Sequence, residues 1–220
     1  MTDLADKRGM ETTVYEAAED SRLLATAAVE GGVESPVLEV GVGSGWVSDH
    51  VATEAGARVI GSDLNPHACR QAAGHGIETF QGDLFGPVTA NAFGTVLFNP
   101  PYLPTDPDNE WDDWMETALS GGESGRALIA PFLDDLCRVL RPDGCAYLLV
   151  SSLAGYDEVL ALAEAAGLSH EPTREESFPF ETLSVLRLCP ARDQQAQDYP
   201  TESDSTQTQP DATQTRLDST

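Results

Sequence analysis

The chain has 220 residues, 40% of them hydrophobic and 7% aromatic, which excludes a disordered protein and suffices for one α/β domain with a sizeable core. The 37 Asp and Glu residues outnumber the 12 Lys and Arg residues, and the formal net charge of −25 disfavours nucleic-acid binding. The start of the chain has no signal-peptide pattern and no apolar stretch could span a bilayer, so we expect a cytoplasmic protein with no membrane partner.

Between about residues 16 and 190, short apolar strands alternate with helices. Helices are predicted at about 17–30, about 45–55, from Asn65-Pro66 onward, at about 124–139 and at 155–166. Strands are predicted at 36–40, 58–61, about 77–81, 95–98, 145–151 and 182–188. Asn65 is a good helix cap, and Pro66 suits the first helical position. The alternation predicts a parallel sheet with helices on both faces.

The composition changes sharply near the end of the chain. Residues 191–220 are rich in Gln, Thr, Ser and Asp and offer almost no apolar side chain to bury. We therefore expect one folded domain at 1–190, followed by a disordered, acidic and polar tail at 191–220.

The acidity has two explanations. An acidic surface would attract a basic partner, whereas in a cytoplasm of multimolar salt the Debye length is roughly 3 Å or less and the repulsion is screened. The acidic residues are scattered along the whole chain, and Lys7 is the only lysine. A dedicated binding face would concentrate the acids, so this pattern favours a halophilic protein.

The four cysteines show neither C-x-x-C spacing nor a neighbouring histidine. Each lies in an apolar or helical context, so we expect reduced structural thiols and no bound metal. The cysteines are Cys69, Cys137, Cys145 and Cys189.

A glycine-rich turn follows the first predicted strand. It reads Glu39-Val40-Gly41-Val42-Gly43-Ser44-Gly45, with GxGxG spacing instead of the GxGxxG of dinucleotide sites. Glycines at 41, 43 and 45 would let the backbone approach a ligand closely. The preceding acid, Glu39, suits the cationic end of S-adenosylmethionine (SAM), so the turn favours SAM over a dinucleotide.

Acidic residues also follow the next two strands, and ligands bind at the carboxyl ends of strands in such sheets. Asp63 can accept two hydrogen bonds from a ribose diol. Asp83 can accept from the adenine amine, with Leu84 against the ring. Each acid alone is typical of a solvated loop, but three in register after three successive strands predict a SAM site.

The fourth predicted strand ends in Asn99-Pro100-Pro101-Tyr102, which points to an acceptor site. Two prolines fix the backbone and leave bare carbonyls, and Tyr102 offers a flat face. A planar NH2 group that donates to the Asn99 oxygen and the Pro100 carbonyl would turn its nitrogen lone pair toward the SAM methyl. No general base is obvious. The alternative is that Asn-Pro-Pro is only a rigid turn.

With these motifs the chain resembles the HemK-type N5-glutamine methyltransferases, which modify the Gly-Gly-Gln loop of class I release factors. It is most similar to their short archaeal and eukaryotic branch, which lacks the separate N-terminal helical domain. The resemblance covers about residues 14–188, and the chain departs from it at Ala17, where branch members typically have proline. It rests on segments 14–21, 39–45, Asp63, Asp83-Leu84, 99–102, Gly121-Gly122, Gly125-Arg126 and 181–186.

The resemblance implies a Rossmann-like class I SAM methyltransferase fold with a seven-stranded, mostly parallel sheet and helices on both faces. It also implies that Asn99 and Pro100 hold the substrate amide. A small zinc-binding activator subunit would pair with the sheet edge near 77–81 and the flank of the second strand, with the zinc in that partner. The implied cofactor contacts are Ser21, Glu39, Gly41, Asp63, Asp83, Leu84 and Asn99.

Three functions remain in competition. The first is N5-glutamine methylation of a release factor. The second is N6-adenine or guanine-amine methylation of DNA or RNA, which uses the same Asn-Pro-Pro-Tyr chemistry but normally needs a target-recognition region or a basic groove. The third is a non-catalytic SAM-binding subunit, which would lack the intact Asn99 motif. The sequence favours the first.

Overall fold

The computed structural model describes residue 14 and residues 17–103 and 121–191. The predicted tail therefore lies outside the described residues, apart from Ala191. Among the described residues, no helix combines the length and the apolar character needed to cross a membrane.

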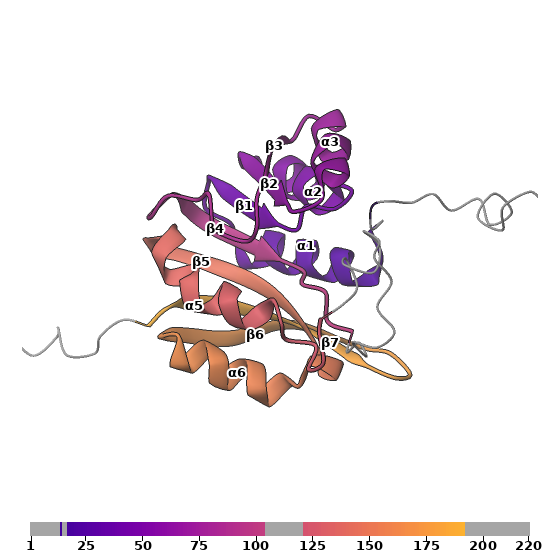
Figure 1. Cartoon of the computed structure of the whole chain (residues 1–220), viewed down its shortest axis with the longest axis vertical. Helices are drawn as coiled ribbons and strands as arrows, with labels where there is room; N and C mark the ends of the chain where they lie inside the picture. The colour runs from indigo at the N-terminus through magenta and orange to yellow at the C-terminus, as the bar shows by residue number, and fades with distance from the viewer. Residues whose placement is uncertain (1–13, 15–16, 104–120, 192–220) are drawn as a thin grey trace, which may run out of the picture.

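The described chain forms a seven-stranded sheet in the order β3-β2-β1-β4-β5-β7-β6 (Figure 1). Every pair from β3 to β5 is parallel, whereas β7 runs antiparallel to both β5 and β6. The mostly parallel sheet is thus confirmed. The strands are β1 (Val37–Val40), β2 (Val59–Asp63), β3 (Glu78–Gln81), β4 (Phe93–Phe98), β5 (Leu140–Ser151), β6 (Leu168–Ser177) and β7 (Thr182–Pro190).

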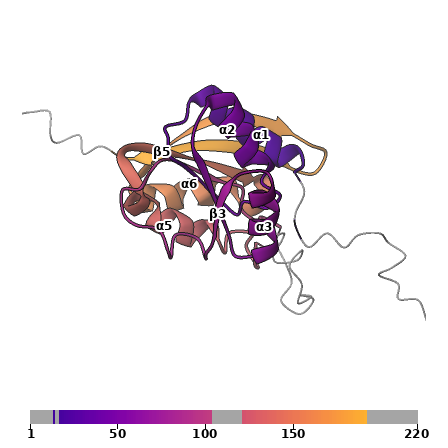
Figure 2. The same cartoon turned by 90° about the horizontal axis from the view of Figure 1, so that it is seen from above.

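Helices cover both faces of the sheet, as the alternation predicts (Figure 2). α1 (Glu19–Gly31) and α2 (Trp46–Ala55) pack on one face, and α5 (Ile129–Val139) and α6 (Tyr156–Ala165) pack on the other. α3 (Pro66–Gly74) packs beside β2 and β3, and a short 3₁₀ helix η2 (Ser152–Ala154) follows β5. The interior strand β5 alternates between the two cores, because Leu148 belongs to one and Tyr147 and Leu149 to the other.

The predicted start of α3 is confirmed. The side chain of Asn65 accepts a hydrogen bond from the backbone N–H of His67 across 2.9 Å, and Pro66 occupies the first helical position. This cap satisfies one of the donors that a helix N-terminus leaves unpaired.

Strand β6 was not predicted from its residues. Nearly all of its side chains are exposed, and its register with β7 shifts between Pro172 and Arg174. An edge strand with no buried face shows no hydrophobic alternation. Two boundaries differ by five residues: α5 begins at Ile129 instead of about 124, and β5 begins at Leu140 instead of 145.

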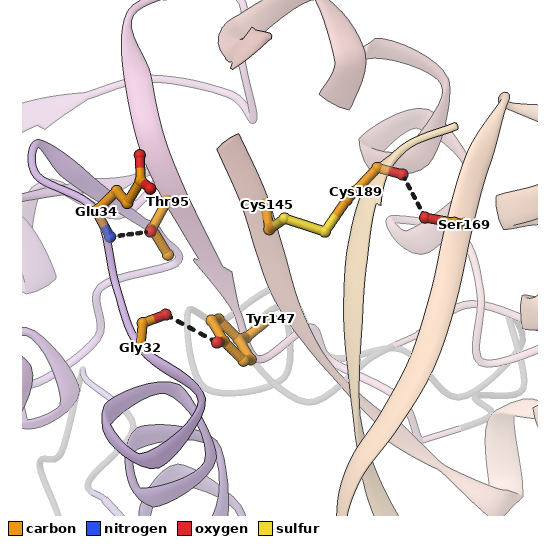
Figure 3. Close-up of a disulfide and its surroundings, with 7 residues drawn as sticks. All are labelled: Gly32, Glu34, Thr95, Cys145, Tyr147, Ser169 and Cys189. Atoms are coloured by element: carbon orange, nitrogen blue, oxygen red, sulfur yellow. Dashed lines mark hydrogen bonds between the residues drawn. A yellow bond between two sulfur atoms is a disulfide. The ribbon is translucent and has the colours of Figure 1, made fainter. Parts of the chain in front are cut away.

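The expectation of four reduced thiols is wrong for two of them, because Cys145 and Cys189 form a disulfide between β5 and β7 (Figure 3). Ala146 pairs with Leu188 in this antiparallel ladder, so Cys145 and Cys189 are the next opposite residues, with their Cα atoms 4.4 Å apart. They are 44 residues apart in the chain, and strand pairing alone brings them together. Cys69 and Cys137 are free.

Two hydrogen bonds anchor the chain between α1 and β1 to the sheet (Figure 3). The hydroxyl of Tyr147 donates to the carbonyl of Gly32 across 2.8 Å, and the N–H of Glu34 donates to Thr95 Oγ1 across 2.8 Å. They tie the segment after α1 to β5 and β4, so the C-terminal end of α1 is fixed relative to the sheet.

Candidate active site

The predicted site residues gather where the strand order reverses between β1 and β4. Val40 of β1 pairs with Phe98 of β4 in a parallel register, so Gly41 and Asn99 follow the two strands side by side. This carboxyl edge is where doubly wound sheets bind ligands. Gly41 has a φ of +68°, and a Cβ there would meet only Phe98 Cε2, at 3.9 Å, among the described atoms. The backbone of Gly41 is thus open to close approach.

The other two glycines of the turn have different surroundings. The N–H of Gly43 donates to Asp63 Oδ2 across 3.0 Å, with φ at +51°. Gly45 has a φ of +86°, and a Cβ there would lie 2.8 Å from both Cα and Cβ of Ala72 in α3. Close packing of the glycine turn on α3 therefore accounts for Gly45, and its cofactor contact stays a prediction.

Glu39 lies within β1 and is almost fully buried, at 4% exposure. Its carboxyl group accepts a short hydrogen bond from the hydroxyl of Ser48 in α2. Burial raises the pKa of Glu39 to about 8, and the nearby charge of Asp63 adds to this, while the Ser48 hydrogen bonds oppose it. A buried acid of this kind is poised to ionise when a cation arrives.

Asp63 closes β2 and joins two loops. Its Oδ2 accepts from Gly43 N, and its Oδ1 accepts from the N–H of Asn65 across 2.8 Å. Burial raises the pKa of Asp63, and these backbone hydrogen bonds partly offset the effect. A carboxylate has about four acceptor positions, so both oxygens keep capacity for a ribose diol.

Asp83 and Leu84 follow β3. The Asp83 side chain is exposed, and its carbonyl accepts from the N–H of Gly86 across 3.0 Å in a turn. Leu84 has a φ of +43°, which is unusual for a residue with a side chain, and it packs partly against the core under α5. The backbone strain at Leu84 marks a loop whose shape the surroundings enforce.

The acceptor segment leaves β4 beside the first turn of α1. The amide nitrogen of Asn99 donates to Asp20 Oδ2 across 3.1 Å, while Asn99 Oδ1 is buried and has no hydrogen-bond partner among the described residues. Pro100 is buried, and Tyr102 is half-buried against both cores. Burial raises the pKa of Tyr102, and the charges of Asp20 and Glu181 raise it further. Tyr102 therefore stays a neutral phenol.

Two further acidic residues, which the sequence motifs do not mark as site residues, lie at this site. Asp20 is 4% exposed and holds the Asn99 amide. Glu181, at the turn before β7, accepts from the hydroxyl of Ser151 across 2.8 Å and lies close enough to Tyr102 to influence its titration. Both belong to segments that carry the family resemblance, which is the signal that could have found them.

The predicted cofactor residue Ser21 lies next to Asp20 in α1. It is 5% exposed, and its N–H donates to Asp20 Oδ1 across 2.6 Å. The turn that contains Gly121 and Gly125 also borders the acceptor segment: Gly121 N donates to the carbonyl of Leu103 across 2.8 Å, and a Cβ on Gly125 would lie 2.7 Å from the Tyr102 carbonyl oxygen. The fold thus brings four segments next to residues 99–102: the start of α1, the glycine turn after β1, the turn with Gly121 and Gly125, and the turn before β7.

The site has polar groups suited to SAM and to a planar amide. No group of three or more potential metal ligands occurs in the part of the chain that the structure describes. The acid in β1 can face a cationic amino group, the acid ending β2 can face a diol, and the orphaned Asn99 oxygen can accept from an NH2 group. A buried acceptor without a partner calls for a ligand that donates.

No family model matched the chain. A Methanocaldococcus jannaschii protein named as a protein N5-glutamine methyltransferase is 36% identical over 186 residues, which cover 82% of this chain and 93% of that protein. The human methyltransferase HEMK2 is 32% identical over 197 residues, which cover 82% of this chain and 92% of HEMK2.

Solved structures agree with these relatives. Mtq2 of E. cuniculi, in a Mtq2–Trm112 complex that methylates the termination factor eRF1, matches with a TM-score of 0.68 and 28% identity over 82% of this chain and all of that chain. A Thermus thermophilus 16S rRNA guanine methyltransferase, solved with SAM and guanosine, matches with a TM-score of 0.56 over 84% of this chain and 41% of that chain. At 20% identity the second match shows the fold alone. The chain belongs to the protein N5-glutamine methyltransferase family, whose members have the class I SAM-dependent methyltransferase fold and use SAM.

Proposed function

We propose that this protein transfers the methyl group of SAM to the side-chain amide nitrogen (N5) of the glutamine in the Gly-Gly-Gln motif of a class I release factor. The observation that carries the proposal is the buried, unpartnered Oδ1 of Asn99 beside the fixed backbone of Pro100. The M. jannaschii relative, which this chain covers over 93% of its length and which is named for protein N5-glutamine methylation, supports the same acceptor.

The acceptor amide needs orientation, because its nitrogen lone pair is delocalised and weakly nucleophilic. Asn99 Oδ1 and the Pro100 carbonyl each accept one hydrogen of the substrate NH2, which fixes the nitrogen and favours its pyramidal form. SAM would supply an electrophilic methyl group: as the N–C bond forms and the sulfonium S–C bond breaks, S-adenosylhomocysteine would leave and the proton of the amide nitrogen would pass to water. Tyr102 packs against the substrate side chain and excludes water.

The cofactor-binding residues in this proposal lie at the carboxyl ends of β1, β2 and β3 or directly after them, together with Ser21 in α1. Glu39 receives the cationic amino acid end, and Asp63 receives the ribose. Asp83 and Leu84 contact the adenine. The backbone of the glycine turn at Gly41, Gly43 and Gly45 lies along the ligand, and the Asn99 backbone completes the site.

A small zinc-binding activator subunit pairs with the β3 edge in this proposal, with the zinc held by the partner. β3 is an edge strand of the sheet, and Glu78 and Gln81 on it are exposed. An edge strand presents unpaired backbone groups that a partner strand can extend. The Mtq2 of E. cuniculi was solved in a complex with a second protein, Trm112, which supports a partner for this chain.

The proposal also includes the domain division at residue 190 and a cytoplasm of high salt. A substrate of the translation machinery supports the compartment, and the formal net charge of −25 supports the salt. The tail is not needed for catalysis in this scheme, since the site is built from residues 20–181.

The test incubates the enzyme in high salt, with and without the activator, with labelled SAM and either release factor or nucleic acid. We expect label on the glutamine of the Gly-Gly-Gln motif, located by mass spectrometry of the tryptic peptide. A release factor with Gln→Ala in that motif is the matched control and should take no label. Label in nucleic acid, with none in the release factor, would favour adenine methylation instead.

A further inference from the structure

We propose that Asp20 is a positioning residue that fixes which end of the Asn99 amide faces the acceptor. This inference rests on the proposed function. Asp20 Oδ2 accepts from Asn99 Nδ2 across 3.1 Å, and Asn99 Oδ1 is left buried without a partner among the described residues. The reverse orientation of the Asn99 side chain would set its oxygen against a carboxylate oxygen and turn its NH2 toward the substrate.

The orientation matters because the substrate amide is itself a donor. An Asn99 side chain turned by 180° about its last bond would present two hydrogens to the two hydrogens of the incoming NH2. A hydrogen bond to a charged group contributes more than a neutral one, so the carboxylate of Asp20 holds the productive orientation strongly. The contact joins residues 79 positions apart, which the placement of α1 beside the end of β4 makes possible.

The two oxygens of Asp20 have different partners, and this gives a sharp test. Oδ1 accepts from the backbone N–H of Ser21 across 2.6 Å, while Oδ2 faces Asn99. A backbone N–H can only donate, so in Asp20→Asn the amide oxygen stays on Ser21 and the new NH2 faces Asn99. Asn99 then turns its own oxygen toward residue 20. The near-isosteric substitution therefore reverses the polarity of the contact.

We expect Asp20→Asn to lower kcat on the release factor at least roughly tenfold, since single oriented groups in such sites contribute about 10²–10³ in rate. The Kd for SAM, measured by calorimetry, and the Tm should change little. Glu19→Gln is the matched control, because Glu19 is an exposed acid in the same first turn of α1. It should keep kcat within twofold.

The reciprocal exchange separates positioning from a merely structural role. Asn99→Asp alone sets two carboxylates against each other and should also lose activity. The double variant Asp20→Asn with Asn99→Asp restores a donor–acceptor pair and leaves one carboxylate oxygen facing the acceptor. It should exceed both single variants several-fold in kcat. The inference is overturned if Asp20→Asn keeps full activity, or if the double variant is no better than either single one.

A spectroscopic measurement keeps this inference distinct from the proposed function. In ¹⁵N-labelled protein the side-chain NH2 of Asn99, assigned by its loss in Asn99→Asp, should show a downfield proton that moves upfield in Asp20→Asn. An unchanged signal would contradict the contact whatever the acceptor is. Failure of the wild-type enzyme to methylate the release factor, with the NH2 signal behaving as expected, would overturn the proposed function alone.

Discussion

The backbone N–H of Gly43 donates to Asp63 Oδ2 across 3.0 Å, so the glycine turn after β1 and the acid ending β2 form one unit. The same carboxylate also holds the β2–α3 turn through Asn65. A ligand that contacts Asp63 is thereby placed against the glycine backbone. The hydrogen bond joins two motifs whose bonded residues are 20 positions apart in the chain.

Asp63→Ala should weaken SAM binding by roughly 10- to 100-fold, because a hydrogen bond to a charged group contributes about 1.5–3 kcal/mol. Isothermal titration with SAM measures the change. Asp143→Ala is the control, since that exposed acid lies near the start of β5, at the amino ends of the parallel strands and so away from the site. Equal affinity in the Asp63 variant and the control would move the ribose site elsewhere.

SAM binding should release a proton at pH 7. Burial raises the pKa of Glu39 to about 8, so the free enzyme holds this group mostly protonated below that pH. A cationic ligand favours the carboxylate, so affinity should rise between pH 6 and 8, by up to about tenfold per pH unit. Calorimetry at pH 7 in phosphate and in Tris, which differ in ionisation enthalpy, measures the proton. Glu39→Gln should abolish it, and a buffer-independent enthalpy in the wild type would refute the linkage.

Asn99→Ala should separate binding from transfer. The variant loses the acceptor for the substrate NH2, so we expect methyl transfer to the release factor to fall at least roughly 100-fold. The SAM affinity should stay within several-fold of the wild type. Filter-bound label and calorimetry on the same preparation give the two values, and parallel losses of both would contradict the division of roles.

Gly45→Ala should destabilise the fold by about 2–4 kcal/mol, from the left-handed backbone and the overlap with Ala72 together. Gly56 is the matched control, because its φ of +64° is also left-handed but nothing lies within 4 Å of a Cβ there. Gly56→Ala should cost about 1 kcal/mol. Urea unfolding in high salt measures both, and equal losses would show that contact with α3 is not what excludes a side chain at 45.

Reducing the Cys145–Cys189 disulfide should lower the free energy of unfolding by about 2–4 kcal/mol, because the crosslink closes a long loop in the unfolded chain. Urea unfolding with and without a phosphine reductant tests this. Cys137→Ser should leave the difference unchanged, since that thiol is free and exposed. Titration of all four thiols in the unfolded, unreduced protein would show that the crosslink does not form.

Local patterns were enough for most of the fold. Each apolar strand buried on both faces could be read directly, and the Asn65-Pro66 cap begins α3 as predicted. β6 could not be predicted in this way, because nearly all of its side chains are exposed and its pairing with β7 defines it. The disulfide could not be predicted from the sequence for a related reason: residues 145 and 189 become neighbours only through the β5–β7 register.

The amino-acid sequence by itself determined the alternation of strands and helices, and with it the placing of Glu39, Asp63 and Asn99 at strand ends. Hydrophobic periodicity and turn chemistry depend on residues that are close in the sequence, so both can be recognised without the structure. Only the tertiary structure decided that Asp20 meets Asn99 and that Gly45 packs on Ala72. Those contacts depend on how α1 and α3 pack on the sheet, and no local pattern in the residues between the two members of each contact indicates that packing.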